Sequence, residues 1–138
     1  MCNYFIKKIS ADGYERIAEI ETPNGVKLTG HFLEHTEYLN KDEMSKIRKQ
    51  GDVLKCSLSI GLITKSSKCD ADIMYRQNIP DSPHIEAVVK VTEVKDEYTV
   101  YAKSNIDGMI LPIEFETKQG YKVDDILYVR GELEFIIK

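Results

Sequence analysis

The stretch Leu127-Tyr128-Val129-Arg130-Gly131-Glu132-Leu133-Glu134-Phe135-Ile136-Ile137 decides the fold of this chain. Apolar residues recur at every second position from Leu127 to Ile137, interrupted only by Gly131. This period of two indicates a β-strand with one face in a core and the other in water. The glycine removes a side chain where a barrel strand would bend. We therefore predict a long, curled barrel strand here.

Three further strands are predicted ahead of this stretch, within residues 84–117. The first has its apolar residues in phase from Ile85 to Val91, and the phase then slips so that Val94 returns to the core side. Such a slip indicates a β-bulge that bends the strand. The next two strands are expected to turn inward Val100 and Ala102, and then Leu111, Ile113 and Phe115.

The order of a bulged strand, a hairpin and a third strand, followed by Val123-Asp124-Asp125-Ile126-Leu127-Tyr128-Val129-Arg130-Gly131-Glu132-Leu133, resembles the later strands of OB-fold domains. In those domains a short acidic turn precedes an alternation of valine, glycine and leucine. The resemblance covers residues 83–138, and the helix usual between the third and fourth strands is reduced here to residues 118–123. It implies an OB-like small β-barrel, while function does not follow from fold.

A β-hairpin is predicted in the N-terminal half, packed with the barrel in a single domain of residues 1–138. Asn24-Gly25 lies between alternating runs at residues 14–22 and 26–35. Both residues of this pair tolerate the positive φ of a tight turn, so the pair favours a hairpin.

One short helix is predicted at about residues 40–50. Asn40 and Glu43 have the spacing of a capping box, Met44 and Ile47 form a narrow apolar stripe, and Gly51 is placed as a stop. Alternation then returns over residues 52–63 and predicts a half-buried strand. The fold class is therefore mainly β, an antiparallel curled sheet or OB-like barrel with one short helix.

Residues 64–83 have no clear period and are longer than most connections in small domains. Two interpretations remain open for this segment. Either an edge strand lies within residues 73–79, or the whole segment is a functional loop.

The overall composition favours a globular protein with an acidic balance. The chain has 138 residues, 30% of them charged, with a formal net charge of −4 and a pI near 5.4. This charge weakly repels nucleic acid and anionic membranes. The three cysteines match no disulfide framework or metal signature, and no apolar stretch is long enough for a signal peptide or a membrane span. We expect a cytoplasmic protein with reduced thiols and no membrane association.

No motif for catalysis, a metal or a cofactor emerges from the sequence. His31 and His35 share one face of a predicted strand but stand roughly 13 Å apart, too far for one metal ion. Asp70 and Asp72 lack the glycine and the distal glutamate of a calcium loop. Cys69 and His84 have no orienting motif that would mark a nucleophile and its base. We therefore expect a protein that is not an enzyme and that holds neither metal nor cofactor.

Nucleic-acid binding is the alternative function, because OB-type barrels stack bases on aromatic side chains and track phosphates with cations. Tyr101 and Lys103 on one outward strand face would suit that role. The outward faces nearby carry Glu114 and Glu116, with Glu132 and Glu134 on the last strand, and these carboxylates would repel phosphates. The preferred interpretation is cross-strand ion pairing of Lys103 with Glu114 or Glu116.

The function predicted first is that of a non-catalytic protein that binds another protein, with a basic partner surface favoured by the acidic balance. A small acidic inhibitor or bacterial immunity protein that neutralises a toxin is one instance. Its oligomeric state stays open. The expected contact surface combines the 64–83 segment with two outward glutamates and consists of Asp70, Asp72, Tyr75, Arg76, Glu114 and Glu116.

Overall fold

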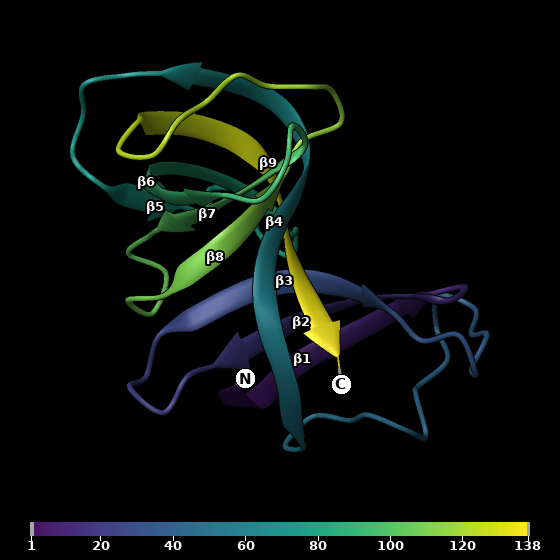
Figure 1. The fold of residues 1–138 in the computed structure, drawn as a ribbon. Helices are drawn as coiled ribbons and strands as arrows, with labels where there is room; N and C mark the ends of the chain where they lie inside the picture. The colour runs from purple at the N-terminus through teal and green to yellow at the C-terminus, as the bar shows by residue number, and fades with distance from the viewer. Residues whose placement is uncertain (1, 138) are drawn as a thin grey trace.

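The computed structural model describes residues 2–137, which form nine β-strands (Figure 1). Their bounds are β1 Cys2–Asp12, β2 Glu15–Glu21, β3 Lys27–Leu33, β4 Val53–Lys68, β5 Met74–Arg76, β6 His84–Val94, β7 Thr99–Lys103, β8 Ile110–Glu114 and β9 Ile126–Ile137. The mainly β prediction is confirmed. No segment of residues 2–137 forms a helix of the length and apolar character that a membrane crossing requires.

The strands after residue 83 form a barrel, as predicted, but they need a fifth strand from earlier in the chain. β6, β7 and β8 pair in antiparallel order, and β9 pairs with both β6 and β4. The ring closes where Ile60 of β4 pairs in parallel with Ile113 of β8. The barrel is therefore not contained in residues 83–138, because β4 forms one of its strands.

A second ring uses the other halves of the same two long strands. β1, β2 and β3 pair in antiparallel order, and residues 2–5 of β1 pair with the start of β4. This ring closes where His31 of β3 pairs in parallel with Glu134 of β9. Figure 1 shows β4 and β9 running side by side through both halves of the molecule. The sheet is therefore mixed rather than wholly antiparallel, although the two closures are its parallel contacts within residues 2–137.

The predicted inward alternation of the barrel strands is confirmed. Ile85, Leu111, Ile113, Leu127 and Leu133 are fully buried in one continuous apolar cluster. The predicted β-bulge lies between Val91 and Glu93, where the register of β6 against β7 shifts. The return of Val94 to the core is wrong, since this side chain is 41% exposed beyond the bulge.

The predicted hairpin joins β2 to β3, with a longer turn than an Asn-Gly pair alone would give. Gly25 donates its N–H to the Thr22 carbonyl, and Thr22 donates to the Val26 carbonyl. Gly25 has φ +83°, so a type I turn is followed by a left-handed residue. Glycine suits this position because the left-handed region is costly for other residues.

The helix predicted at about residues 40–50 is wrong, because this segment forms turns and bends. The capping contacts do form, since Glu43 accepts from the Asn40 N–H at 3.1 Å. Later backbone donors bind side chains instead of helix carbonyls: Lys46 N–H binds the Glu37 carboxylate, which lies outside the segment, and Arg48 N–H binds the nearby Ser45 hydroxyl. Met44, which is predicted to lie on the buried face of the helix, is 81% exposed. Without an apolar surface to cover, a short helix has little to stabilise it.

Residues 64–83 contain two strand segments, residues 64–68 and 74–76, joined and followed by loop. β4 continues to Lys68 past a bulge between Gly61 and Lys65, and Leu62 there has φ 49°. Of the two interpretations left open for this segment, the edge strand within residues 73–79 is present as the short β5, which pairs with β6.

Candidate binding surfaces

The predicted contact surface is divided in the structure. Asp70 and Asp72 are exposed between β4 and β5, and Tyr75 and Arg76 lie on β5, where Arg76 pairs with Glu86 at 3.2 Å. Tyr75 pairs in register with Ala87 near the start of β6, whereas Glu114 pairs with Thr99 beside its far end. Several residues of β6 separate Tyr75 from Glu114, roughly 20 Å of strand. The structure does not bring them onto one surface.

Glu114 and Glu116 lie instead with two glutamates of β9. Glu114 follows Ile113, which pairs with Ile60, and the next residue of β4, Gly61, pairs with Glu132. A Cβ added to Gly61 would meet the Glu134 carboxylate, so that side chain lies across β4 at the glycine. We call Glu114, Glu116, Glu132 and Glu134 the acidic junction, because they lie where the two rings meet.

The electrostatics of the acidic junction are visible at Glu134. Burial raises the pKa of its carboxyl above the ordinary value, and the charges of Glu114, Glu132 and Glu116 raise it further. His31 opposes this shift, with Nε2 3.8 Å from the Glu134 carboxylate. Like charges close together destabilise one another, and an approaching cation would relieve that repulsion.

The predicted pairing of Lys103 with Glu114 or Glu116 is wrong. Lys103 pairs in register with Ile110, at the opposite end of β8 from Glu114. Within residues 2–137, neither Lys103 nor Glu114, Glu116 or Glu132 takes part in an ion pair. Within residues 2–137, the acidic junction therefore presents these three carboxylates without an ion-pair partner.

Tyr101 and Lys103, the residues expected to serve nucleic-acid binding, lie on β7, where Tyr101 is half-buried and Lys103 exposed. A cluster that sequence reasoning missed lies elsewhere on the barrel. The Lys65 ammonium stands 5.9 Å from the centre of the Tyr128 ring, and Arg130 pairs in register with Lys65. Two residues apart on β9, Tyr128 and Arg130 share the outward face, a signal the sequence alone contained.

The residue pairs considered for chemistry do not converge. The Cys69 backbone N–H donates to the Ile126 carbonyl, whereas His84 of β6 lies opposite Glu132 of β9 in the strand register. Six residue steps along β9 separate Ile126 from Glu132, roughly 20 Å. No group of three or more histidine, cysteine or acidic side chains in residues 2–137 has a geometry that could hold a metal ion.

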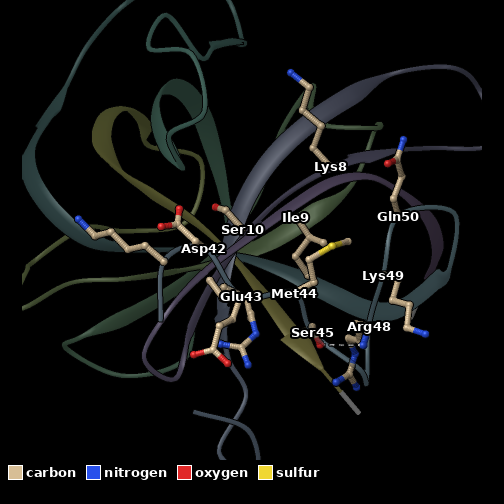
Figure 2. Close-up of a pocket in the computed structure, with 13 residues that line it drawn as sticks. Lys8, Ile9, Ser10, Asp42, Glu43, Met44, Ser45, Arg48, Lys49 and Gln50 are labelled. Atoms are coloured by element: carbon tan, nitrogen blue, oxygen red, sulfur yellow. Dashed lines mark hydrogen bonds between the residues drawn. The ribbon is translucent and has the colours of Figure 1, made fainter. Parts of the chain in front are cut away.

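A groove runs along the outer edge of β1, facing residues 41–50, which we call the flap (Figure 2). Its volume is about 330 Å³. Ile9 and Ala11 contribute the apolar floor, and Met44 of the flap lies beside Ile9 in Figure 2. The remaining lining residues are polar or charged: Lys8, Ser10, Arg16, Lys41, Asp42, Glu43, Ser45, Arg48, Lys49 and Gln50.

Glu37 fastens the flap to the β1–β2 hairpin. Its carboxylate accepts from the Ser45 hydroxyl at 2.6 Å, from the Lys46 N–H at 2.9 Å and from buried Arg16 at 3.2 Å. These contacts lower the pKa of the Glu37 carboxyl, the Ser45 bond most of all. Arg48 pairs with Glu34 as a second fastening.

Comparisons of this chain with protein-family models, with curated proteins and with solved structures find no match.

Proposed function

We propose that this chain is a non-catalytic binding protein that engages a basic surface of another protein through the acidic junction. The observation that carries this proposal is the gathering of Glu114, Glu116 and Glu132 around Glu134 with no lysine or arginine paired to the first three within residues 2–137. A basic partner would relieve their mutual repulsion and would be steered toward them during approach. A separate surface holds the other residues predicted to contact a partner, and it is secondary in this proposal. These residues are Asp70, Asp72, Tyr75 and Arg76.

A small acidic inhibitor or immunity protein that covers a toxin's basic surface is the instance we favour. Cys2, Cys56 and Cys69 are free thiols, which suits a reducing compartment, and we place the protein in the cytoplasm on this ground.

The test is affinity capture from lysate of the source cells, with the wild-type chain and three charge-reversal variants as bait. Glu114→Lys combined with Glu132→Lys should abolish capture of the partner, because both changes put cations into the acidic junction. Asp70→Lys combined with Asp72→Lys should retain it. Glu93→Lys, on an exposed position of β6, is the matched control. No protein retained specifically by the wild-type bait, or equal retention by the Glu114/Glu132 variant, would rule the proposal out.

Single-stranded nucleic-acid binding is the second candidate, and the cation cluster around Tyr128 is the observation that favours it. Aromatic rings flanked by cations bind stacked bases and phosphates in barrels of this size. Glu86 weakens the case, since it accepts a bond from the Tyr128 hydroxyl at 2.9 Å and pairs with Arg76. A titration with fluorescent single-stranded oligonucleotides should show salt-sensitive binding that Tyr128→Ala removes. Absence of binding at low salt would end this candidate.

A further inference from the structure

The outer edge of β1 is paired at two points and open between them. Ile6 exchanges backbone hydrogen bonds with Gly51 and Asp52, and Gly13 exchanges two with Leu39. Asp12 and Glu15 close the β1–β2 hairpin as a directly opposed pair. Successive residues of a strand direct their backbone N–H and C=O groups to opposite edges, so Asp12, Ser10 and Lys8 direct theirs to β2.

Ile9 and Ala11 therefore direct their N–H and C=O groups away from β2, into the groove under the flap. Neither residue forms a further backbone or side-chain hydrogen bond on that side within residues 2–137. Each thus offers one donor and one acceptor, spaced as a neighbouring strand would require. The flap leaves the sheet at Leu39 and returns at Gly51, so it arches over this open stretch of edge.

The side chains around the opening have two kinds of chemistry. Ile9 on the groove floor is partly buried, and Met44 of the flap is 81% exposed, so both leave apolar surface to be covered. Buried Arg16 is already paired with Glu37, and Arg48 with Glu34. At the exposed rim, Lys41 and Lys49 form no ion pair within residues 2–137. Of the two carboxylates that line the groove, Glu43 accepts hydrogen bonds from Asn40, which leaves Asp42 against the two lysines. An occupant with apolar and acidic side chains on its two faces would complement both.

We propose that this groove accepts an extended, acidic segment of a partner protein, which adds a strand to β1 between the strand and the flap. The backbone of the segment pairs with Ile9 and Ala11. Its apolar side chains cover Ile9 and Met44, and its carboxylates meet Lys41 and Lys49. This is peptide recognition by strand addition, in which backbone bonds provide affinity and alternate side chains provide selectivity.

A second copy of this chain fits the opening less well than a peptide does. Edge-to-edge pairing of two β1 strands would bring the flap of each copy against the other copy, because the flap stands over the same stretch of edge. A lone extended segment meets no such obstruction. The site is lined by none of the four glutamates of the acidic junction, so it goes beyond the function proposed above and can succeed or fail independently of it.

The test uses the full chain, isotopically labelled, titrated with a synthetic peptide of alternating valine and glutamate. The amide signals of Ile9 and Ala11 should shift on binding and their hydrogen exchange should slow. Lys41→Glu combined with Lys49→Glu should weaken binding by about tenfold or more. Lys55→Glu, exposed on β4 outside the groove, is the matched control and should bind as the wild type does. A peptide with lysine in place of glutamate should bind more weakly than the acidic one.

Ala11→Pro gives an independent check, since proline removes the outward N–H while an edge position tolerates its ring. A folded Ala11→Pro variant should lose most of its affinity. Glu114→Lys combined with Glu132→Lys should leave peptide binding unchanged, which separates this site from the acidic junction. The proposal is overturned if the acidic peptide does not bind at low salt, if the shifts avoid Ile9 and Ala11, or if these amides are protected only by dimerisation of the chain.

Discussion

His31 of β3 and Glu134 of β9 face each other at the one register position that joins these strands within residues 2–137, with Nε2 3.8 Å from Oε1. The same contact closes the N-terminal ring and includes the Glu134 carboxyl, whose pKa burial raises. His31 Nε2 is buried and forms no hydrogen bond within the described residues. A ring closure and a charge cluster therefore share a single pair of side chains.

Stability should depend on pH through Glu134. Its pKa is raised in the folded state, chiefly by burial, so the folded protein holds this proton more tightly than the unfolded chain does. The resulting stabilisation is present below the unfolded value of 4.5 and is lost as pH rises through the raised folded value. Glu134→Gln removes the titration, so its stability relative to wild type should increase as pH rises across this window. Urea unfolding at a series of pH values measures it, with Glu93→Gln as the control.

The histidine should counteract that shift. Removing the imidazole by His31→Asn takes away the group that lowers the pKa of Glu134, so that pKa should rise further. A carbon-detected NMR titration of the Glu134 carboxyl gives the value directly. An unchanged or lower pKa in the variant would contradict the pairing described here.

Two glycines at the crossing of β4 and β9 should differ in their tolerance of a methyl group. A Cβ at Gly131 would stand 2.5 Å from the Gly61 carbonyl oxygen, which is backbone, so Gly131→Ala should destabilise by about 2 kcal/mol. A Cβ at Gly61 would meet mainly the flexible Glu134 side chain, so Gly61→Ala should cost less. In a Glu134→Ala background the cost of Gly61→Ala should shrink further, whereas that of Gly131→Ala should not. Chemical denaturation of the variants provides the comparison.

The flap should open in acid before the protein unfolds. The contacts of Glu37 lower its pKa, so their stabilisation is present above the unfolded value of 4.5 and is lost as pH falls through the lowered folded value. Hydrogen exchange at Lys46, whose amide binds this carboxylate, should then accelerate while exchange in β9 stays slow. Glu37→Gln should give the same fast exchange at neutral pH. Equal protection of Lys46 in variant and wild type would show that the flap is held by something else.

The thiols should differ sharply in reactivity. Burial, with a smaller effect from Cys2, raises the pKa of the Cys56 thiol to about 12, so almost none of it is thiolate near neutral pH. Cys69, half-buried between β4 and β5, should be alkylated at least about a hundredfold faster than Cys56 in the folded protein. Mass spectrometry after timed iodoacetamide treatment identifies the modified sites. Loss of the difference in urea would confirm that the fold protects Cys56.

Local residue patterns predicted the strands well, because alternation acts over a few neighbouring residues. The inward residues of β6, β8 and β9, the bulge after Val91 and the hairpin at Gly25 all follow from such patterns. The helix prediction is wrong because a contact from outside the local pattern overrides it. Asn40 and Glu43 form their local contacts, but Glu37, outside the pattern, binds the Lys46 amide that the helix needed.

The candidate surfaces could be predicted only as separate pieces. The sequence predicts Glu114 and Glu116 on one surface with Tyr75 and Arg76, yet the register of β7 with β8 and of β5 with β6 places these pairs far apart. The groove at β1 had no sequence signal, since it exists because the flap departs at Leu39 and returns at Gly51.

The C-terminal stretch from Leu127 to Ile137 determined by itself that this chain builds a curled β structure, because its alternation leaves one face to be buried. The tertiary structure alone decided that this strand and β4 serve two rings. Each ring closes through a single parallel register position, Ile60 with Ile113 and His31 with Glu134, within residues 2–137. Such closures join residues more than fifty positions apart and depend on the packing of every strand between them, which no local pattern encodes.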